Sequence, residues 1–359
     1  MSDKPTIDEL RTRIDNIDVE LLALLNQRIR LAQSVGHNKS TQGQEVYRAD
    51  REAQIISGLV ARNSGPLEAD QVSFLFREII SIARRAEGPL TVALLGPAGT
   101  YSETAALKQF GHQIERLEAA SVDEVFRLTE SGSATFGVVP VENSTEGGIN
   151  TTLDRLLETT LVICGEIELR IEHCLLGHSG GQVPRLVMGH QQALAQCRHW
   201  LDSHYPNVPR IAASSNAQAA MMAMEDGKTA AIAGEIAAQI YELDILARNI
   251  EDQVDNTTRF IIVGREDVAP SGCDKTSIMV SMENKPGALF RVLEPFHRSG
   301  VSLTSIETRP SNAGRWSYVF FIDFEGHASD QNIQDVLKVV DCDALEVKLL
   351  GSYPRALRV

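Results

Sequence analysis

IDELRTRIDNIDVELLALLNQRIRLAQSV, residues 7–35, carries the strongest structural signal in the chain. Its apolar residues recur at spacings of four and three, and no proline or glycine interrupts the run. This period predicts one long amphipathic helix. One position of the stripe holds Arg28, and a guanidinium on an apolar seam is unfavourable unless an anion meets it. The stripe consists of Leu10, Ile14, Ile17, Leu21, Leu24, Arg28, Leu31 and Val35.

Two other basic residues of this helix indicate what the anion could be. Lys39 follows Arg28 by eleven residues, which returns it to within about 20° on the helix at a rise of roughly 16 Å. The two side chains could clasp one compact dianion. Arg11 lies about 25 Å from Arg28 along the axis, so it can share that site only if it comes from a second chain. The spacing predicts an intertwined dimer, and an ion pair between Arg28 and a neighbouring helix is the structural alternative.

The composition is that of an ordinary globular protein, and it excludes several kinds of partner. With 359 residues the chain is long enough for two or three domains. A net charge of −14 without a long basic run argues against binding to nucleic acid or to acidic membranes. The five cysteines form no CxxC pair and have no metal-ligand spacing, so we expect reduced thiols, no bound metal and a cytoplasmic location. The N-terminus lacks a signal-peptide pattern, and no apolar stretch is long enough to span a membrane.

Three kinds of secondary-structure pattern follow one another along the chain. Residues 1–89 contain only helical patterns, and three helices with one very long member make a poor core for a monomer. Residues 90–268 alternate strand and helix patterns, which predicts an α/β domain with largely parallel strands, long enough for two lobes. Residues 275–355 follow the order strand, helix, strand, strand, helix, strand, typical of the α+β ferredoxin-like fold. We therefore predict a multidomain chain with one all-α, one α/β and one α+β domain.

The helical segment carries four further charged candidates, namely Arg48, Arg51, Glu52 and Glu87. Together with the three cations of the first helix, they resemble the pattern of the all-helical class of chorismate mutase over residues 6–87. The resemblance implies that chorismate is rearranged to prephenate by electrostatic preorganisation and restriction to a reactive conformer, without covalent catalysis.

The resemblance also implies roles for individual residues of the mutase segment. Arg28 and a second chain's Arg11 would hold the two carboxylates, while Lys39 and Glu87 would hydrogen-bond the ether oxygen as negative charge develops there. This chain has Glu87 where the family often has glutamine, and a buried carboxyl that stays protonated could donate that hydrogen bond. Taken alone, Glu87 could equally be a frayed helix end beside Gly88.

Two other positions of the mutase segment depart from the family pattern. Arg48 stands where an acid is common, and Ala83 stands where a serine is common. The first change leaves Glu52 as the candidate that recognises the hydroxyl of the substrate.

Four motifs of the middle segment share small and hydroxyl-bearing residues beside strand ends. They are GPAGTYSE at 96–103, VVPVENSTEGG at 138–148, SSNAQAA at 214–220 and NTTRF at 256–260. Small residues before a helix N-terminus suit a carboxylate, whereas single residues such as Ser102 or Ser144 are more often caps or turn formers. As a set, the motifs resemble prephenate dehydratase over residues 90–265, a bilobal fold like that of type II periplasmic binding proteins. The resemblance implies a site between the lobes formed by Thr100, Ser102, Asn143, Ser144, Thr145, Ser215, Asn216, Thr258, Arg259 and Phe260.

The implied reaction removes carbon dioxide and hydroxide from prephenate to give phenylpyruvate. Arg259 and helix-terminal amides would hold carboxylates of the substrate. Thr258 would hydrogen-bond the departing ring hydroxyl, and because its hydroxyl is a poor acid we expect it to orient and polarise rather than to transfer a proton fully. No cofactor is implied, and GPAGT is not the GxGxxG loop of a dinucleotide site.

Two short motifs of the last segment resemble the phenylalanine-binding motifs of ACT regulatory domains. They are GALF at 287–290 and ETRP at 307–310, with Thr308 where serine is common. Asn284 could help to bind the amino-acid backbone, although NKPG could also be an ordinary turn of the fold. The implied regulatory residues are Asn284, Gly287, Ala288, Leu289, Phe290, Glu307, Thr308, Arg309 and Pro310.

The three resemblances together imply a bifunctional enzyme of phenylalanine biosynthesis that is inhibited by phenylalanine, and we expect it to assemble as a homodimer or a tetramer. A mutase fused to a prephenate dehydrogenase is disfavoured because no GxGxxG fingerprint with a paired ribose-binding acid is present. A mutase fused to a non-catalytic amino-acid sensor is the other alternative, and Thr258, Arg259 and the VENST loop argue against it. Closure of the lobes coupled to a reorientation of the last domain is the expected route of regulation.

Overall fold

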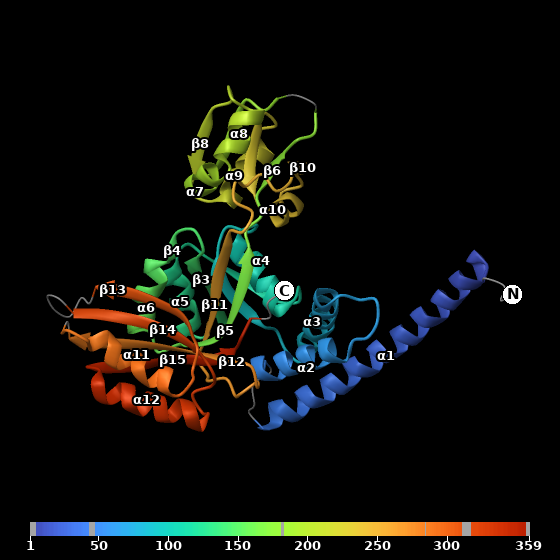
Figure 1. Cartoon of the computed structure of the whole chain (residues 1–359). Helices are drawn as coiled ribbons and strands as arrows, with labels where there is room; N and C mark the ends of the chain where they lie inside the picture. The colour runs from blue at the N-terminus through green and yellow to red at the C-terminus, as the bar shows by residue number, and fades with distance from the viewer. Residues whose placement is uncertain (1–4, 43–46, 181–182, 284, 311–316, 357–359) are drawn as a thin grey trace.

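The computed structural model describes residues 5–42, 47–180, 183–283, 285–310 and 317–356, without the side chains of residues 39–42 and 317. Helices come first along the chain, then two α/β lobes, then a four-stranded sheet with two helices (Figure 1). The predicted succession of an all-α, an α/β and an α+β part is confirmed.

The N-terminal part is a long helix with two shorter helices packed beside its C-terminal half. The helices are α1 (Ile7–Gln42), α2 (Ala49–Arg62) and α3 (Ala69–Arg85). The N-terminal half of α1 projects away from the rest of the chain (Figure 1). The seven apolar members of its stripe are between 43% and 62% exposed. A single chain therefore leaves the apolar face of α1 uncovered.

The first lobe of the α/β part contains a mixed sheet in the order β2-β1-β3-β11-β5, with the short β4 beside β3. Apolar side chains of this sheet enter core clusters on both of its faces, because helices cover one part of it and the C-terminal sheet covers another. Its elements are β1 (Thr91–Leu95), α4 (Tyr101–Phe110), β2 (Glu115–Ala119), α5 (Val122–Glu130), β3 (Phe136–Asn143), β4 (Gly147–Gly148), α6 (Asn150–Glu158), β5 (Val162–Arg170) and β11 (Thr257–Gly264).

The second lobe is inserted between β5 and β11 and forms its own sheet in the order β10-β6-β9-β7-β8. In Figure 1 it lies at the end of the first lobe from which β5 leaves and at which β11 begins. Its elements are β6 (Cys174–Gly177), β7 (Leu186–His190), α7 (Gln191–Gln196), α8 (Arg198–His204), β8 (Arg210–Ala213), α9 (Asn216–Glu225), β9 (Thr229–Ala233), α10 (Glu235–Ile240) and β10 (Asp244–Ala247).

The prediction of largely parallel strands was wrong. Parallel pairing is confined to β1 with β2 and β3, and to β7 with β8 and β9. The chain crosses between the lobes twice, and the strands that flank the crossings (β5, β6, β10 and β11) all pair antiparallel. An inserted lobe imposes this arrangement, since a strand that leaves and a strand that returns at one edge run in opposite directions.

The C-terminal part has the predicted ferredoxin-like order, with all strands antiparallel in the order β13-β14-β12-β15. One face of its sheet packs against its own helices, through residues such as Ile278 and Ile322. The other face packs against the first lobe, where Met279 and Phe321 share a core with residues of β3 and β11. The elements are β12 (Asp274–Glu283), α11 (Ala288–Arg298), β13 (Leu303–Pro310), β14 (Ser317–Glu325), α12 (Gln331–Asp343) and β15 (Glu346–Pro354).

Candidate active sites and regulatory site

The two lobes turn the carboxyl ends of their parallel strands toward each other. In the first lobe, β1 and β3 end at the same edge, and β11 starts there because Thr258 pairs with Asn143. In the second lobe, β7, β8 and β9 end at the edge where β6 begins, since Cys174 pairs with Ala233. Ligands of open α/β sheets bind outside this edge. The topology therefore brings most of the predicted dehydratase residues to the junction between the lobes.

A cluster of buried polar side chains lies at the first-lobe edge of this junction. Asn143 and Thr258 are 7% and 8% exposed. The Nδ2 of Asn143 donates to Thr258 Oγ1 at 2.8 Å and to Asn256 Oδ1 at 3.0 Å. Thr145 donates to Asn143 Oδ1 through its backbone N at 3.1 Å and its hydroxyl at 2.6 Å. Sequence reasoning missed Asn256, although it begins the NTTRF motif.

The remaining hydroxyl and amide candidates lie around the same junction as caps and turn residues. Thr100 is the N-cap of α4, and its hydroxyl accepts from Glu103 N and donates to Leu95 O. Ser215 is the N-cap of α9 in the second lobe, and the Asn216 side chain accepts from His190 N at 2.8 Å. Ser144 and Thr257 exchange hydrogen bonds of 2.9 and 3.0 Å. The capping interpretation thus holds for Thr100 and Ser215, and it leaves the free amides of two helix N-termini at the junction.

Two predicted dehydratase residues have buried side chains for which no contact with this cluster is found. Ser102 is 5% exposed in the first turn of α4. Phe260 is 2% exposed and belongs to the hydrophobic core of the first lobe.

Direct contacts tie the GPAGTY loop to the second lobe. Tyr101 Oη lies 2.8 Å from His173 Nδ1, and the second ring nitrogen of His173 lies 2.9 Å from Gln196 Oε1. Tyr241 Oη donates to Ala98 O at 2.8 Å. Gly99 has a φ of 89°, and a Cβ there would lie 3.2 Å from the backbone of Ala237. The loop thus needs a glycine both for its conformation and for its approach to α10.

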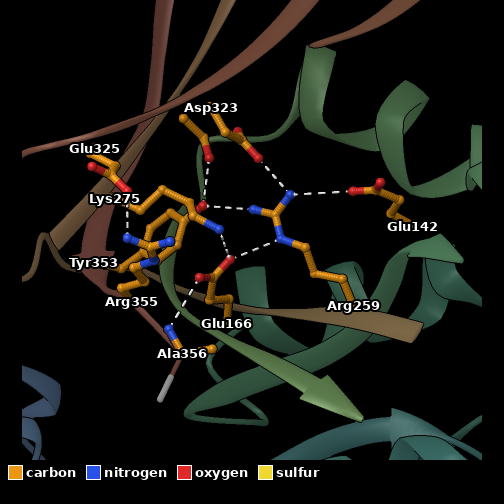
Figure 2. A network of polar contacts seen from close by, with 10 residues as sticks. Glu142, Glu166, Arg259, Lys275, Asp323, Glu325, Tyr353, Arg355 and Ala356 are labelled. Carbon is orange, nitrogen blue, oxygen red and sulfur yellow. Dashed lines mark hydrogen bonds and ion pairs between the residues drawn. The ribbon is translucent and has the colours of Figure 1, made fainter. Parts of the chain in front are cut away.

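Arg259 lies on the face of β11 opposite to Thr258, in an ionic network that joins the first lobe to the C-terminal sheet (Figure 2). Its guanidinium contacts Glu166 at 2.8 Å and Asp323 at 2.5 Å, and donates to Tyr353 Oη at 2.9 Å. Lys275 Nζ contacts Glu166 at 2.7 Å. In this conformation the guanidinium is occupied by protein carboxylates, so its predicted role as a ligand of a substrate carboxylate stays a prediction.

The centre of the network in Figure 2 is buried, and its charges stabilise one another. Burial alone would disfavour the charge of Arg259, but Asp323, Tyr353 and Glu166 hold the pKa of Arg259 well above its ordinary value. Burial likewise opposes ionisation of Glu166, and the cations Arg259 and Lys275 nevertheless hold its pKa below the ordinary value. The group is therefore an ionised cluster between two domains, in which each charge depends on its partners.

In the helical part, most of the predicted mutase residues line one cavity of about 300 Å³. Arg28 faces it from α1, and burial lowers the pKa of Arg28 while the carboxylates of Glu52 and Glu87 act in the opposite direction. Glu87 approaches α1 at Gly36, where a Cβ would lie 2.6 Å from Glu87 Cγ. The residues that line the cavity are Arg28, Leu31, Ala32, Val35, Arg48, Arg51, Glu52, Ile55, Ile80, Ala83, Arg84 and Glu87.

Arg84 is the mutase-domain residue that sequence reasoning missed. It is 3% exposed, forms a 2.6 Å ion pair with Glu52 and donates to the backbone oxygen of Phe110 at the end of α4. It thus fixes one of the predicted site residues and ties the helices to the first lobe. Arg48 pairs with Asp50 at 2.5 Å and is more than half exposed.

Of the other two predicted mutase cations, Arg11 lies away from the cavity, and the side chain of Lys39 is not described. Arg11 is exposed near the free end of α1, where it pairs with Asp8 at 3.5 Å. The backbone of Lys39 lies in α1, but its side chain is outside the described residues. A straight α1 keeps Arg11 away from Arg28, as the spacing predicted.

The two regulatory motifs lie at the start of α11 and on the edge strand β13. Gly287 has a φ of 78° directly before α11, and Phe290 is 65% exposed. Thr308 is exposed, whereas its neighbours Glu307 and Arg309 face the first lobe. Arg309 contacts Asp154 of α6 at 2.7 Å.

Burial and two nearby carboxylates, Glu142 and Asp323, raise the pKa of Glu307. Leu289 is partly exposed in the first turn of α11, with Ala288 less exposed beside it, and Pro310 ends β13. Asn284 lies outside the described residues.

The described residues contain neither a metal-binding cluster nor a membrane-spanning helix. No group of three or more His, Cys, Asp or Glu side chains is arranged to hold a metal ion. None of the helices in the described ranges combines the length and the apolar character needed to cross a bilayer.

The chain resembles known proteins over its whole length. Family models match for chorismate mutase type II at residues 10–88, prephenate dehydratase at 92–268 and the ACT domain at 276–342. A bifunctional chorismate mutase/prephenate dehydratase of Pseudomonas aeruginosa is 50% identical over 99% of this chain and 100% of its own. One from Aquifex aeolicus is 41% identical over 98% of both chains. The crystal structure of an Arthrobacter aurescens prephenate dehydratase in complex with L-Phe matches with a TM-score of 0.69 and 36% identity, over 74% of this chain and 90% of that one.

The helical cavity, the bilobal junction and the ferredoxin-like domain define a fused isomerase and carbon–oxygen lyase with a regulatory domain. The chain belongs to the family of bifunctional chorismate mutase/prephenate dehydratases. The alternative fusion with a dehydrogenase is not supported, because the dehydratase model covers the segment in question.

Proposed function

We propose that the cavity beneath α1 rearranges chorismate to prephenate, and that the lobe junction converts prephenate to phenylpyruvate under feedback by phenylalanine. The observation that carries the second activity is the hydrogen bond of 2.8 Å between Asn143 and Thr258 at the junction. The first product is then the substrate of the second site.

The mutase site is completed by a second copy of the chain. Arg28, Glu52 and Glu87 line the cavity from α1, α2 and the end of α3, and the uncovered stripe of α1 supplies an apolar surface for dimerisation. Arg11 is too distant in its own chain and would enter the partner's cavity. There it would hold a carboxylate of chorismate opposite Arg28, with Lys39 and Glu87 at the ether oxygen.

Mixing two inactive variants tests the shared mutase site. Arg11→Ala and Arg28→Ala should each lose most mutase activity. When equal amounts are dissociated and allowed to reassociate, half of the dimers carry one intact site, so about a quarter of the activity should return. No recovery, with mixed dimers verified by mass spectrometry, would show that both arginines act within one chain.

The dehydratase step needs no group beyond those of the protein. The C–O bond of the ring hydroxyl breaks with its electron pair, the C–C bond to the ring carboxylate breaks and feeds its electrons into the ring, and carbon dioxide and hydroxide leave. The hydroxyl of Thr258 hydrogen-bonds the departing oxygen, and the helix N-termini capped by Thr100 and Ser215 are suited to the carboxylates.

Feeding chorismate and following prephenate and phenylpyruvate separately tests the two assignments together. Thr258→Ala should lower the dehydratase kcat by about a hundredfold or more and leave mutase turnover unchanged. Equal losses of both activities would indicate a folding defect instead. A chain that binds prephenate without turnover would support the sensor alternative, against which the ordered hydroxyl of Thr258 argues.

Phenylalanine is the proposed ligand of the C-terminal domain, at Gly287–Phe290 and the Glu307–Pro310 strand. Because Gly287 has a positive φ, Gly287→Ala should strain this turn and weaken phenylalanine binding, measured by calorimetry. Gly272→Ala is the matched control, since Gly272 has a φ of 95° in open space. If phenylalanine neither binds nor inhibits the parent protein, the regulatory assignment fails.

We propose a cytoplasmic location for the chain, and its thiols support this proposal. Cys164, Cys174 and Cys197 are buried, and no disulfide joins the cysteines of the described residues. Thiols kept reduced fit a cytoplasmic enzyme.

A further inference from the structure

The side-chain amide of Asn143 has one defined orientation. The backbone N–H of Thr145 can only donate, and it lies 3.1 Å from Oδ1 of Asn143. The Thr145 hydroxyl donates to the same oxygen at 2.6 Å. The amino group of Asn143 must therefore point the other way, toward Thr258 and Asn256.

This orientation determines the direction of the hydrogen bond at Thr258. The two amino protons of Asn143 go to Thr258 Oγ1 and Asn256 Oδ1, so the donor capacity of the amide is filled. Thr258 accepts, and its own proton is not used in that bond. Within the described chain no acceptor is found for this proton, which leaves it available to a ligand at the junction.

Asn256 is placed to hold the amide in this orientation. Asn256 is 4% exposed, and its Oδ1 accepts from Asn143 Nδ2 at 3.0 Å. The Thr145 hydroxyl, whose single proton goes to Asn143, lies 3.1 Å from the same oxygen. The backbone oxygen of Asn256 accepts from Ile171 N at 2.8 Å, so Asn256 is anchored where both connections between the lobes pass. A rotated Asn143 amide would present its oxygen to Thr258, and the Thr258 proton would then be donated to Asn143.

We propose that Asn256 is a positioning residue of the dehydratase site, which holds Asn143 so that Thr258 donates to the departing hydroxyl of the substrate. The proposal rests on the function proposed above for Thr258. Asn256 acts through Asn143 and Thr258 and does not itself touch the substrate.

Steady-state kinetics of the full-length chain with prephenate test this role. Asn256→Ala should lower kcat by about tenfold to a hundredfold, since the donor is misdirected but not deleted, and should change KM by less than about threefold. Asn256→Asp keeps an acceptor oxygen and should restore kcat to within about threefold of the parent. If the alanine variant does not fold, Asn256→Leu keeps the volume without the acceptor and should show the same loss of kcat.

Thr159→Ala is the matched control in the same lobe. Thr159 is also buried, and its hydroxyl donates at 2.6 Å to Glu130, away from the junction. The dehydratase kcat of Thr159→Ala should stay close to that of the parent, and mutase turnover should be unchanged in every variant.

A double-mutant cycle separates action through Thr258 from a general defect. In the Thr258→Ala background, Asn256→Ala should cost little further activity, because the proton it directs is gone. The proposal is overturned if Asn256→Ala leaves kcat unchanged, if Asn256→Asp is as impaired as the alanine variant, or if the loss is as large in the Thr258→Ala background. Failure of the assigned function itself would appear separately, as a Thr258→Ala variant with full dehydratase activity.

Discussion

Thr258 and Arg259 are neighbours on β11 that face opposite sides of the sheet, one toward the lobe junction and the other toward the C-terminal domain. The hydroxyl of Thr258 meets Asn143, and the guanidinium of Arg259 meets Asp323. One strand thus carries both the proposed catalytic hydroxyl and a main ionic tie to the regulatory domain.

Removing Asp323 should destabilise the contact between the first lobe and the C-terminal domain. Asp323→Ala leaves the buried Arg259 with one carboxylate fewer at close range, and breaking a buried pair in this way costs about 3–5 kcal/mol. We expect a urea unfolding transition at lower concentration and faster limited proteolysis between the first lobe and the C-terminal domain. Asp335→Ala, which removes an exposed partner of Lys338 on α12, is the control and should have little effect.

A charge on the uncovered stripe of α1 should abolish dimerisation. Leu24 is 61% exposed in the single chain, and Leu24→Asp places a carboxylate on the surface that we assign to the partner. Size-exclusion chromatography with light scattering should show a monomer, and mutase activity should be lost while dehydratase activity persists. Asn26→Asp introduces the same charge on the opposite side of the helix and should leave the assembly intact. A Leu24→Asp variant that is still dimeric and active would contradict the assigned interface.

The mutase reaction should lose rate as pH rises if Glu87 donates a hydrogen bond to the ether oxygen. Only the protonated carboxyl can donate, so deprotonation removes the donor and adds a repulsive charge. Glu87→Gln donates at every pH and should give a flatter profile of kcat against pH. Glu225→Gln, on α9 of the second lobe, should keep the parent's profile. The same pH dependence in the parent and in Glu87→Gln would remove Glu87 from this role.

The lobe junction should become less stable as pH falls below neutrality. Burial lowers the pKa of His173 below its ordinary value of 6.5, while Gln196 and Glu251 act in the opposite direction. At pH values between the lowered pKa of folded His173 and its ordinary pKa, the unfolded chain binds a proton that the folded chain does not. The free energy of unfolding therefore decreases as pH falls, by at most about 1.4 kcal/mol per pH unit. Melts between pH 5 and 8 should show a smaller slope for His173→Gln than for the parent. His199→Gln, with an exposed ring, should leave the slope unchanged.

Local patterns predicted a large part of this structure. The period of residues 7–35 predicted α1. The one cation on its stripe lies at the cavity that we propose as the mutase site, where the burial of a charge in an apolar seam needs a partner. The order of strands and helices predicted the C-terminal fold, since its elements are contiguous and each follows its own period.

The features that were missed depend on contacts between distant parts of the chain. Arg84 looks like an ordinary basic residue in the last turn of a helix, and only the packing of α3 on α4 buries it against Glu52 and Phe110. The opposite directions of Thr258 and Arg259 follow from strand alternation, but which face meets the regulatory domain depends on docking. Antiparallel β11 could not be recognised because its partners β3 and β5 lie far upstream of it.

The insertion of the second lobe also sets an order of events during synthesis. β11 lies between β3 and β5, so the ribosome must complete the whole second lobe before the first sheet receives this strand. Until then β5 has no neighbour in its sheet, whereas every strand of the second lobe is already present. The second lobe, although later in the sequence, can therefore fold first on the nascent chain. The strand β11, which brings Thr258 into place, also completes the sheet of the first lobe.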